Sequence, residues 1–95
     1  MIKTFRNDAA EAAWERRYIK GVPNEIIRTA YRKLLQLHNA QTLNDLRAPP
    51  GNRLEGLQGD RVGQHSVRIN DQWRLCFRWE DGDAYDVEIV DYHRG

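Results

Sequence analysis

Hydrophobic and polar residues alternate along the stretch from Gln64 to Trp79. Between Val67 and the end of this stretch the large apolar residues all occupy odd positions: Val67, Ile69, Trp73, Leu75, Phe77 and Trp79. Even positions include Arg68, Arg74 and Arg78. A period of two residues is typical of a half-buried β-strand. The pattern therefore predicts a pair of strands with one apolar face and one arginine face.

The pairing of these strands follows if all odd residues stay on one face. Residues directly opposite each other in an antiparallel pair share a face. Ile69 is therefore expected opposite Trp73, with residues 70–72 forming a three-residue connection that contains a bulge. In this register Arg68 lies directly opposite Arg74 on the arginine face.

A second hairpin is expected nearer the carboxyl terminus, with Gly82 at the tip of its turn. The same parity argument puts Trp79 opposite Tyr85. Arg78 then faces Asp86, which supplies a cross-strand partner of opposite charge. The strand that follows extends the apolar face toward the end of the chain.

Helical periodicity appears in the first half of the chain. From residue 24 to about residue 39 one stripe of side chains recurs at helical spacing, at Ile27, Tyr31, Leu34 and His38. An alanine-rich segment, residues 9–18, follows Asp8, which has the spacing of a capping box with Glu11. This segment predicts a first helix that ends at Gly21. Because few residues join them, the two helices are expected to form an antiparallel hairpin.

Shorter segments connect these regions. Residues 2–6 alternate imperfectly and predict an edge strand, and residues 41–47 predict one further helical turn. Residues 48–52 hold two prolines and a glycine, which exclude both a helix and a central strand there. Residues 53–57 predict a short strand. The order of strand, two helices and antiparallel strands indicates an α+β fold, with helices on the apolar face and the arginine face left open.

Composition narrows the class of protein. Ninety-five residues, 40% of them hydrophobic, suit one domain spanning residues 1–95. A formal net charge of +1 excludes the signature of a strongly basic nucleic-acid-binding protein. Arginine still outnumbers lysine twelve to three. This bias favours phosphate recognition, because the guanidinium fork matches phosphate oxygens; GC-rich coding explains it equally well.

The cysteine, the histidines and the longest apolar segments indicate the cellular compartment and whether a metal or cofactor is expected. Cys76 is the single cysteine, so a reducing compartment is expected, and its place in a strand favours a small filler over a nucleophile. No segment has the length of a signal-peptide core or a membrane span, which predicts a cytoplasmic protein. The three histidines, His38, His65 and His93, lack metal-ligand spacing, so we expect neither metal nor cofactor.

The arginine face holds a mismatch of charge. Arg78 has Asp86 as its predicted partner, which makes it a structural residue. Arg68 and Arg74 face each other without a carboxylate at an equivalent place, and like charges directly opposite are destabilising. An anion bound between them resolves the mismatch; the alternative is that both side chains simply extend into solvent.

Groups suited to acid–base chemistry are expected beside these arginines. Tyr92 falls diagonally beside Arg74, and His93 titrates near neutral pH. Glu55 is the nearby carboxylate able to act as a base, although on its own it is better explained as a surface residue balancing Arg53. Such a set suits RNA cleavage by the strand's own 2′-OH: a base removes the proton, arginines hold the phosphate charge and an acid protonates the leaving 5′ oxygen.

Residues 49–79, PPGNRLEGLQGDRVGQHSVRINDQWRLCFRW, followed by VEIVDYH at residues 87–93, resemble the HigB branch of the RelE toxin superfamily. These are toxins of bacterial type II toxin–antitoxin modules, and the resemblance covers nearly the whole chain. It implies a RelE-like fold, a small antiparallel sheet with an N-terminal helical hairpin on one face. It further implies cleavage of mRNA in the A site of the 70S ribosome. The implied partner is a HigA-like helix-turn-helix antitoxin, through which the complex would reach operator DNA.

The resemblance carries over residue by residue. The candidate catalytic residues are Glu55, Arg68, Arg74, Asp91, Tyr92 and His93. The candidate RNA-binding residues are Arg53, Gln58, Arg61 and His65. Some relatives have a histidine and a lysine where this chain has Glu55 and Gln58, and other members of the superfamily have a glutamate base at the first of these positions. The general base therefore stays open between Glu55 and His93, and a non-catalytic or attenuated RNA- or antitoxin-binding relative is the alternative function.

Overall fold

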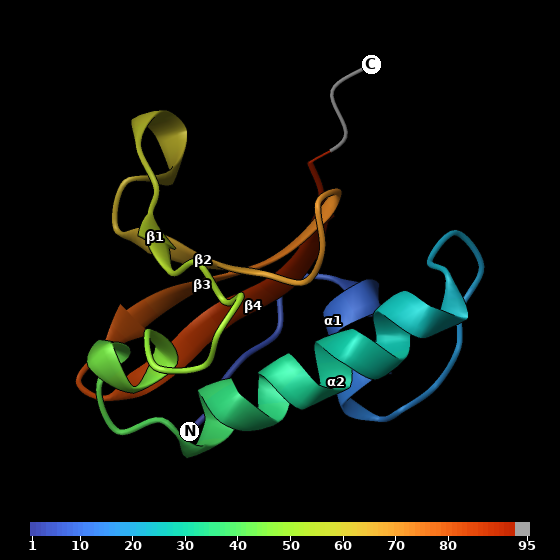
Figure 1. Cartoon of the computed structure of the whole chain (residues 1–95), viewed down its shortest axis with the longest axis horizontal. Helices are drawn as coiled ribbons and strands as arrows, with labels where there is room; N and C mark the ends of the chain where they lie inside the picture. Colours follow the sequence, from blue (N-terminus) through green and yellow to red (C-terminus); the bar gives the residue numbers. More distant parts are fainter. Residues whose placement is uncertain (93–95) are drawn as a thin grey trace.

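The computed structural model describes residues 1–92, so the predicted site residue His93 lies outside the described part of the chain. The elements, in order, are α1 (Asp8–Trp14), α2 (Asn24–Asn39), the 3-10 turn η1 (Leu43–Leu46), β1 (Glu55–Gly56), the 3-10 turn η2 (Gly59–Arg61), β2 (Gln64–Arg68), β3 (Trp73–Glu80) and β4 (Asp83–Asp91). The strands form one antiparallel sheet in the order β1-β2-β3-β4. Both helices lie on one face of this sheet (Figure 1), which confirms the predicted α+β arrangement.

Helix α2 occupies the predicted residues, and its apolar stripe faces the sheet. Ile27, Leu34 and Leu37 are at most 1% exposed. The two helices pack against each other as expected, with the rings of Trp14 and Tyr31 6.2 Å apart. Within residues 1–92, no helix is both long and apolar enough to cross a lipid bilayer.

Helix α1 differs from the prediction at both ends. Its N-cap is Asn7 rather than Asp8, because the Asn7 side chain accepts a hydrogen bond from the N–H of Ala10 at 3.0 Å. The same side chain donates to the carbonyl of Ile89 at 2.9 Å, which ties the helix to β4. The helix ends at Trp14, well before Gly21, because Arg16 adopts a left-handed conformation with φ of 57°.

The hairpin of β2 and β3 has the predicted register. Arg68 lies opposite Arg74, and the N–H of Ile69 donates to the carbonyl of Trp73 at 3.0 Å. The connection 70–72 therefore leaves all odd residues of both strands on one face. The prediction from hydrophobic parity is confirmed here because neither strand contains an extra residue.

The hairpin of β3 and β4 is shifted by one residue from the prediction. Arg78 lies opposite Tyr85 rather than Asp86, so Trp79 does not oppose Tyr85. The turn consists of Asp81 and Gly82, both with positive φ (51° and 81°), as in a two-residue type I′ turn. A bulge with Asp86 at φ of 53° then absorbs the extra residue and restores the parity of the strand.

The outer segments of the sheet are less regular than predicted. Residues 2–6 run beside β4 through isolated parallel bridges, from Ile2 to Ala84 and from Phe5 to Val87, instead of forming a regular strand. At the other edge the strand predicted over residues 53–57 is reduced to Glu55–Gly56. Most of the backbone pairing in the sheet is therefore made by β2, β3 and β4, and residues 2–6 and β1 add only short paired segments at its two edges.

Residues 48–52 form neither helix nor strand, as predicted. They also hold the end of β2 in place through hydrogen bonds of Asn52. Asn52 is fully buried, and its side-chain amide donates to the carbonyl of Leu46 at 3.1 Å and to Gln36 Oε1 at 3.0 Å. Its own carbonyl accepts the N–H of Arg68 at 2.6 Å. A buried amide satisfied in this way fixes the backbone position from which Arg68 extends.

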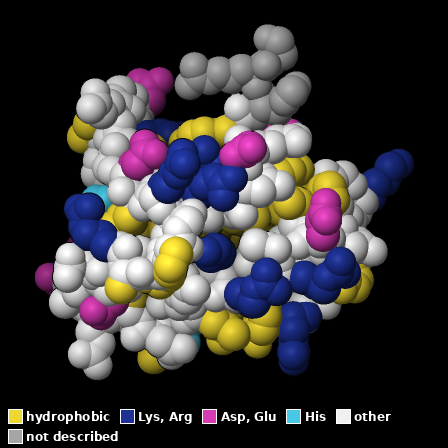
Figure 2. Space-filling model, viewed as in Figure 1, with side chains coloured by type: hydrophobic (Ala, Val, Ile, Leu, Met, Phe, Trp, Pro, Cys, Tyr) yellow, Lys and Arg dark blue, Asp and Glu magenta, His cyan; other side chains and the backbone are white. Residues whose placement is uncertain are grey.

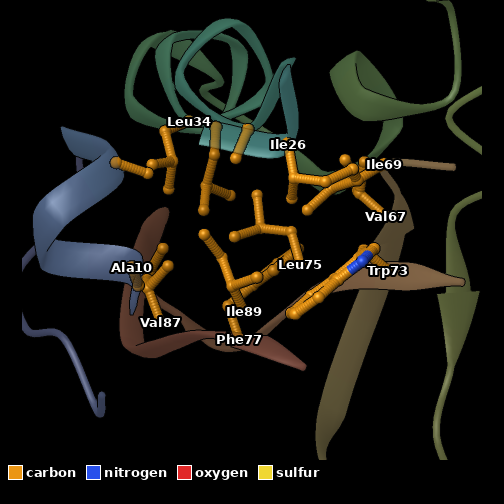
Figure 3. Close-up of a cluster of buried hydrophobic side chains, with 14 of the residues drawn as sticks. Ala10, Ile26, Leu34, Val67, Ile69, Trp73, Leu75, Phe77, Val87 and Ile89 are labelled. Atoms are coloured by element: carbon orange, nitrogen blue, oxygen red, sulfur yellow. The ribbon is translucent and has the colours of Figure 1, made fainter. Parts of the chain in front are cut away.

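The core fills the space between the helices and the odd face of the sheet (Figure 3). Figure 3 shows Leu34 and Ile26 from α2 pointing toward Leu75 and Phe77 of β3, with Ala10 of α1 beside Val87. Every odd apolar residue from Val67 to Phe77 is buried, as the alternation predicts: Val67, Ile69, Trp73, Leu75 and Phe77. The opposite, even face is the one that carries the arginines.

Candidate active site

The even face of the sheet brings together several candidate residues. The register places Glu55 of β1 opposite Ser66, Ser66 opposite Cys76, and Cys76 opposite Glu88, so these four share one row across the sheet. The adjacent row contains Arg68 opposite Arg74. Because residues two apart in a strand point to the same face, Glu55 lies on the face of both arginines.

Arg74 is held in place without a carboxylate. Its Nη1 donates to the carbonyls of Asn70 and Trp73, the latter at 3.2 Å. Its guanidinium lies 5.5 Å from the centre of the Tyr92 ring, which confirms that Tyr92 stands beside Arg74. Among residues 1–92 no ion pair involves Arg74. The fixed guanidinium therefore keeps its charge available for an anion.

Arg68 has a carboxylate partner, contrary to the prediction. Its Nη2 lies 2.5 Å from Asp71 Oδ1, a residue of the hairpin connection rather than of the facing strand. This contact lowers the pKa of Asp71, first through the hydrogen bond and then through the charge of Arg68. Asp71 is 97% exposed, so the pair stays hydrated and is weak. An incoming phosphate can replace the Asp71 carboxylate.

Arg78 is the neutralised arginine of this face, as predicted. Its Nε lies 3.4 Å from Asp86 Oδ2, and its Nη1 pairs with Glu80. The guanidinium also lies 4.8 Å from the centre of the Tyr85 ring. Arg78 and Asp86 form an ion pair although they are not directly opposite each other, because Asp86 lies in the bulge beside Tyr85, the residue opposite Arg78. Arg78 is therefore a structural residue.

The middle of the even face is covered, which corrects the expectation of an open face. Ser66, Cys76 and Glu88 are all buried. Arg61 reaches across from η2, with Nη2 3.2 Å from Glu88 Oε1 and Nη1 3.1 Å from Gln64 Oε1. The hydrogen bond with Glu88 raises the pKa of Arg61 further above its usual value. Arg61, predicted from the sequence as an RNA-binding residue, thus lies at the centre of this face and pairs with Glu88.

Glu88 is the residue of this face that sequence reasoning missed. It is 6% exposed and lies near two arginines, Arg61 and Arg6, the latter with Nε 3.3 Å from Oε2. The signal was present in the sequence: Glu88 stands between the core residues Val87 and Ile89 at an even position of the last strand. Glu88 is buried because Arg61 lies against it from η2, and a buried carboxylate needs such a cationic partner.

Replacing Glu88 by glutamine is expected to lower the free energy of unfolding by about 1–3 kcal/mol, because both ion pairs of a buried carboxylate are lost. Urea denaturation followed by tryptophan fluorescence measures this change. Glu80→Gln is the matched control, since Glu80 is exposed and its one ion pair within residues 1–92 is with Arg78. Its effect should stay below about 0.5 kcal/mol. Equal losses of unfolding free energy in the two variants would contradict the prediction that the ion pairs of Glu88 stabilise the fold.

Cys76 and Tyr92 meet beneath these arginines. Cys76 Sγ lies 3.9 Å from the Tyr92 hydroxyl, and Cys76 is fully buried. Burial is the largest cause that raises the pKa of the thiol, and it also raises the pKa of the Tyr92 phenol. Both groups are therefore protonated at neutral pH. This agrees with the prediction of Cys76 as a filler and leaves Tyr92 able to donate a hydrogen bond.

The remaining candidate residues are dispersed. His65 lies opposite Phe77 on the helix side of the sheet, with ring centres 5.9 Å apart, and burial followed by Arg47 lowers its pKa. Arg53 and Gln58 are exposed on the segments that flank β1. Asp91 ends β4 opposite Trp73 and accepts a hydrogen bond from Gln72 Nε2 at 3.1 Å. The structure thus gathers Glu55, Arg61, Arg68, Arg74 and Tyr92 on one face, whereas His65 and Asp91 lie opposite residues of the odd face. The charge of Arg53 lowers the pKa of Asp71, the partner of Arg68.

Comparison with known proteins identifies the family of this chain. The family model described as the RelE-like toxin of the type II toxin–antitoxin system HigB matches residues 3–93. The chain belongs to this family of HigB-like toxins. It is 45% identical over 73 residues to Toxin HigB-1 of Vibrio cholerae, covering 77% of this chain and 76% of the relative. It is 30% identical over 93 residues to Endoribonuclease HigB of Proteus vulgaris, covering 98% of this chain and all of the relative.

Solved structures agree on the fold. A YafQ mutant from E. coli superposes with a TM-score of 0.65 at 15% identity, covering 96% of this chain and 91% of the other. YoeB in its complex with YefM from Staphylococcus aureus gives a TM-score of 0.59 at 18% identity, covering 99% of both chains. The predicted RelE-like fold of this HigB-like toxin is therefore confirmed. Membership in a toxin–antitoxin family also gives the chain an antitoxin as its partner.

Proposed function

We propose that this HigB-like toxin is an endoribonuclease that cuts mRNA in the A site of the 70S ribosome and so stops translation. The observation that carries the proposal is Arg74, whose guanidinium is fixed by two carbonyls and the Tyr92 ring and takes part in no ion pair within residues 1–92. Its charge also lowers the pKa of Asp71, but that carboxylate is 97% exposed and pairs with Arg68. A fixed cation of this kind stabilises charge that develops on a scissile phosphate. The Proteus vulgaris relative bears the name of an endoribonuclease, which supports the same activity.

The proposed reaction uses the RNA strand's own 2′-OH. A general base removes its proton, the 2′ oxygen forms a bond to phosphorus, and the bond from phosphorus to the 5′ oxygen breaks. Arg74 and Arg68 hold the phosphate oxygens while charge builds on them. Tyr92 supplies a stacking surface and a hydroxyl donor. This chemistry requires no metal ion, because arginines stabilise the charge and side chains move the protons.

Glu55 is the general base in this proposal. It is exposed on the even face, and among residues 1–92 no ion pair involves it. Glu88, the other carboxylate of that row, is buried and engaged by Arg61 and Arg6. The leaving 5′ oxygen needs a separate acid, and His93 is the candidate for that step, because Asp91 lies opposite Trp73 and outside the face of Glu55 and Arg74.

Glu55→Gln is expected to lower the single-turnover rate of cleavage by about 100-fold, since glutamine cannot accept the proton. The rate is measured under single-turnover conditions on programmed ribosomes. Glu25→Gln, an exposed substitution at the start of α2, is the control and should leave the rate unchanged. A Glu55→Gln rate equal to that of the control would transfer the role of base to another group.

A non-catalytic or attenuated binding relative is the second candidate, and Gln58 is the observation that favours it. Some members of the family have a lysine where this chain has Gln58, so one cation expected near the RNA is missing. Toe-printing on translating ribosomes separates the two functions. Cuts within A-site codons support the endoribonuclease, whereas ribosome binding without cuts at high protein concentration supports the binding relative.

The proposal also names the partners of the toxin. The antitoxin would be a HigA-like helix-turn-helix protein, and the toxin would reach operator DNA only through it. The candidate RNA-binding residues, Arg53, Gln58, Arg61 and His65, would contact RNA backbone or its surroundings. Action on translating ribosomes places the toxin in the cytoplasm. A gel-shift assay in which the complex, but not the toxin alone, retards operator DNA tests the repressor role.

A further inference from the structure

A pocket of about 340 Å³ opens between the segment that follows α1 and the first half of α2. Its lining residues are Arg16, Tyr18, Ile27, Arg28, Tyr31 and Arg32. The helices cover the odd face of the sheet, whereas Arg74 and Tyr92 belong to the even face, so the pocket is separate from the candidate active site. The proposed cleavage chemistry uses none of its lining residues, although Ile27 also belongs to the core.

The rim of this pocket carries positive charge without internal compensation. Among residues 1–92, no ion pair involves Arg16, Arg28 or Arg32. Figure 2 shows Lys and Arg side chains gathered over the first half of α2. Elsewhere on the chain arginines such as Arg78 and Arg17 have carboxylate partners. Three uncompensated guanidinium groups around one pocket indicate that the negative charge comes from another molecule.

One arginine of the rim is held by a strained backbone. Arg16 has a φ of 57°, a conformation that glycine adopts at lower cost at the end of a helix. Its guanidinium lies 5.1 Å from the centre of the Tyr31 ring, which orients it over the pocket. Glycine would adopt this left-handed conformation at the end of α1 with less strain. The structure of the helix alone therefore does not account for an arginine at this position.

The interior of the pocket is apolar and aromatic. Ile27 is 1% exposed and forms part of the lining, whereas Tyr18 is 51% exposed, a large aromatic side chain left open to solvent. A volume of about 340 Å³ accommodates one large apolar side chain with its backbone. RNA would better suit an open cationic track with stacking platforms than a closed apolar floor.

We propose that this pocket docks an acidic segment of a partner protein, with one aliphatic or aromatic side chain entering beside Ile27 and Tyr31. Carboxylates before and after that side chain would bind the guanidinium groups of Arg16, Arg28 and Arg32. The antitoxin is the partner protein that the family provides, and we infer that it supplies the segment. The proposal does not depend on ribonuclease activity, so it stands or falls separately from the function proposed above.

The test is a titration of the ¹⁵N-labelled full chain with a synthetic eight-residue peptide. The peptide has a central Leu-Tyr pair with three Asp or Glu residues on each side. One control peptide replaces the acids by Asn and Gln, another replaces the central pair by two alanines, and oligouridine of equal length tests for RNA. The acidic peptide should give saturable amide shifts at residues 16–32, and each control should bind at least about tenfold more weakly.

Charge exchange then identifies the arginines. Arg28→Glu should weaken binding of the acidic peptide at least about tenfold, because a carboxylate then faces the carboxylates of the peptide. Lys3→Glu, an exposed substitution with the same change of charge outside the pocket, should change affinity less than about twofold. Arg16→Gly should weaken binding without lowering the melting temperature, because glycine relieves the strained backbone.

Three results would overturn the proposal. The first is equal affinity for the acidic and the neutral peptide. The second is binding of oligouridine to residues 16–32 more tightly than the acidic peptide, which would assign the pocket to nucleic acid. The third is a shift pattern confined to the even face of the sheet. Absence of ribonuclease activity in the same preparation would count against the proposed function alone.

Discussion

Replacing Arg74 by alanine is expected to lower the rate of mRNA cleavage by about 100- to 1000-fold while the fold is retained. The Arg74 guanidinium is fixed by the carbonyls of Asn70 and Trp73 and by the Tyr92 ring, so in the proposed reaction it would meet the scissile phosphate without reorganising. Its side chain is half-buried at the rim of the sheet and contributes little to the core. Primer extension on translating ribosomes measures the rate, and growth after induction reports the loss of toxicity.

Arg78→Ala is the matched control for this experiment. Arg78 stands four residues further along the same strand and face, but Asp86 and Glu80 already neutralise it. Cleavage by this variant should remain within about threefold of the original rate. Equal losses in the two variants would mean that general positive charge, rather than the position of Arg74, drives the reaction. A fully active Arg74→Ala protein would show that the active site lies elsewhere.

Phe77→Ala is expected to lower the free energy of unfolding by about 3–5 kcal/mol. Phe77 is fully buried in the centre of the core, with ring centres 5.9 Å from His65 and 6.3 Å from Trp79 (Figure 3). Truncation of this side chain leaves a cavity in the core, and the helices and the sheet cannot move together far enough to fill it. Urea denaturation measures the loss, and for a chain of this size much of the native population disappears.

Val62→Ala is the control for the core substitution, because Val62 is 74% exposed. Its effect should lie within about 0.5 kcal/mol. A loss below about 1 kcal/mol for Phe77→Ala would mean that the core collapses readily around the missing ring. That result would contradict the tight packing between α2 and the odd face.

The agreement between sequence and structure is best where one local pattern decides the outcome. The stripe of α2 requires a helix over 24–39, because only a helical period places Ile27, Leu34 and Leu37 on one side. The alternation from Val67 to Phe77 requires strands, and parity then sets Arg68 opposite Arg74. The arginine face and its neighbour Tyr92 follow from these two patterns.

The disagreements arise where a residue interrupts a regular period. The parity argument assumed that β3 and β4 pair without an extra residue, but Asp86 in a left-handed conformation inserts one. The Asp-Gly pair at 81–82 is a known signal for a two-residue turn and would have revealed the shift. Asn7 displaced Asp8 as the N-cap because its amide also binds Ile89, 82 residues away.

The sequence by itself determined the α+β fold, the face on which the arginines lie and the pairing of Arg68 with Arg74. These features follow from residues close together in the chain, because their spacing fixes the side of the helix or strand on which each side chain lies. Only the tertiary structure decided the pairing of Arg61 with Glu88 and the position of His65. Such contacts join segments far apart in the chain, and a residue's own neighbours in sequence do not encode which distant charge or ring it will meet.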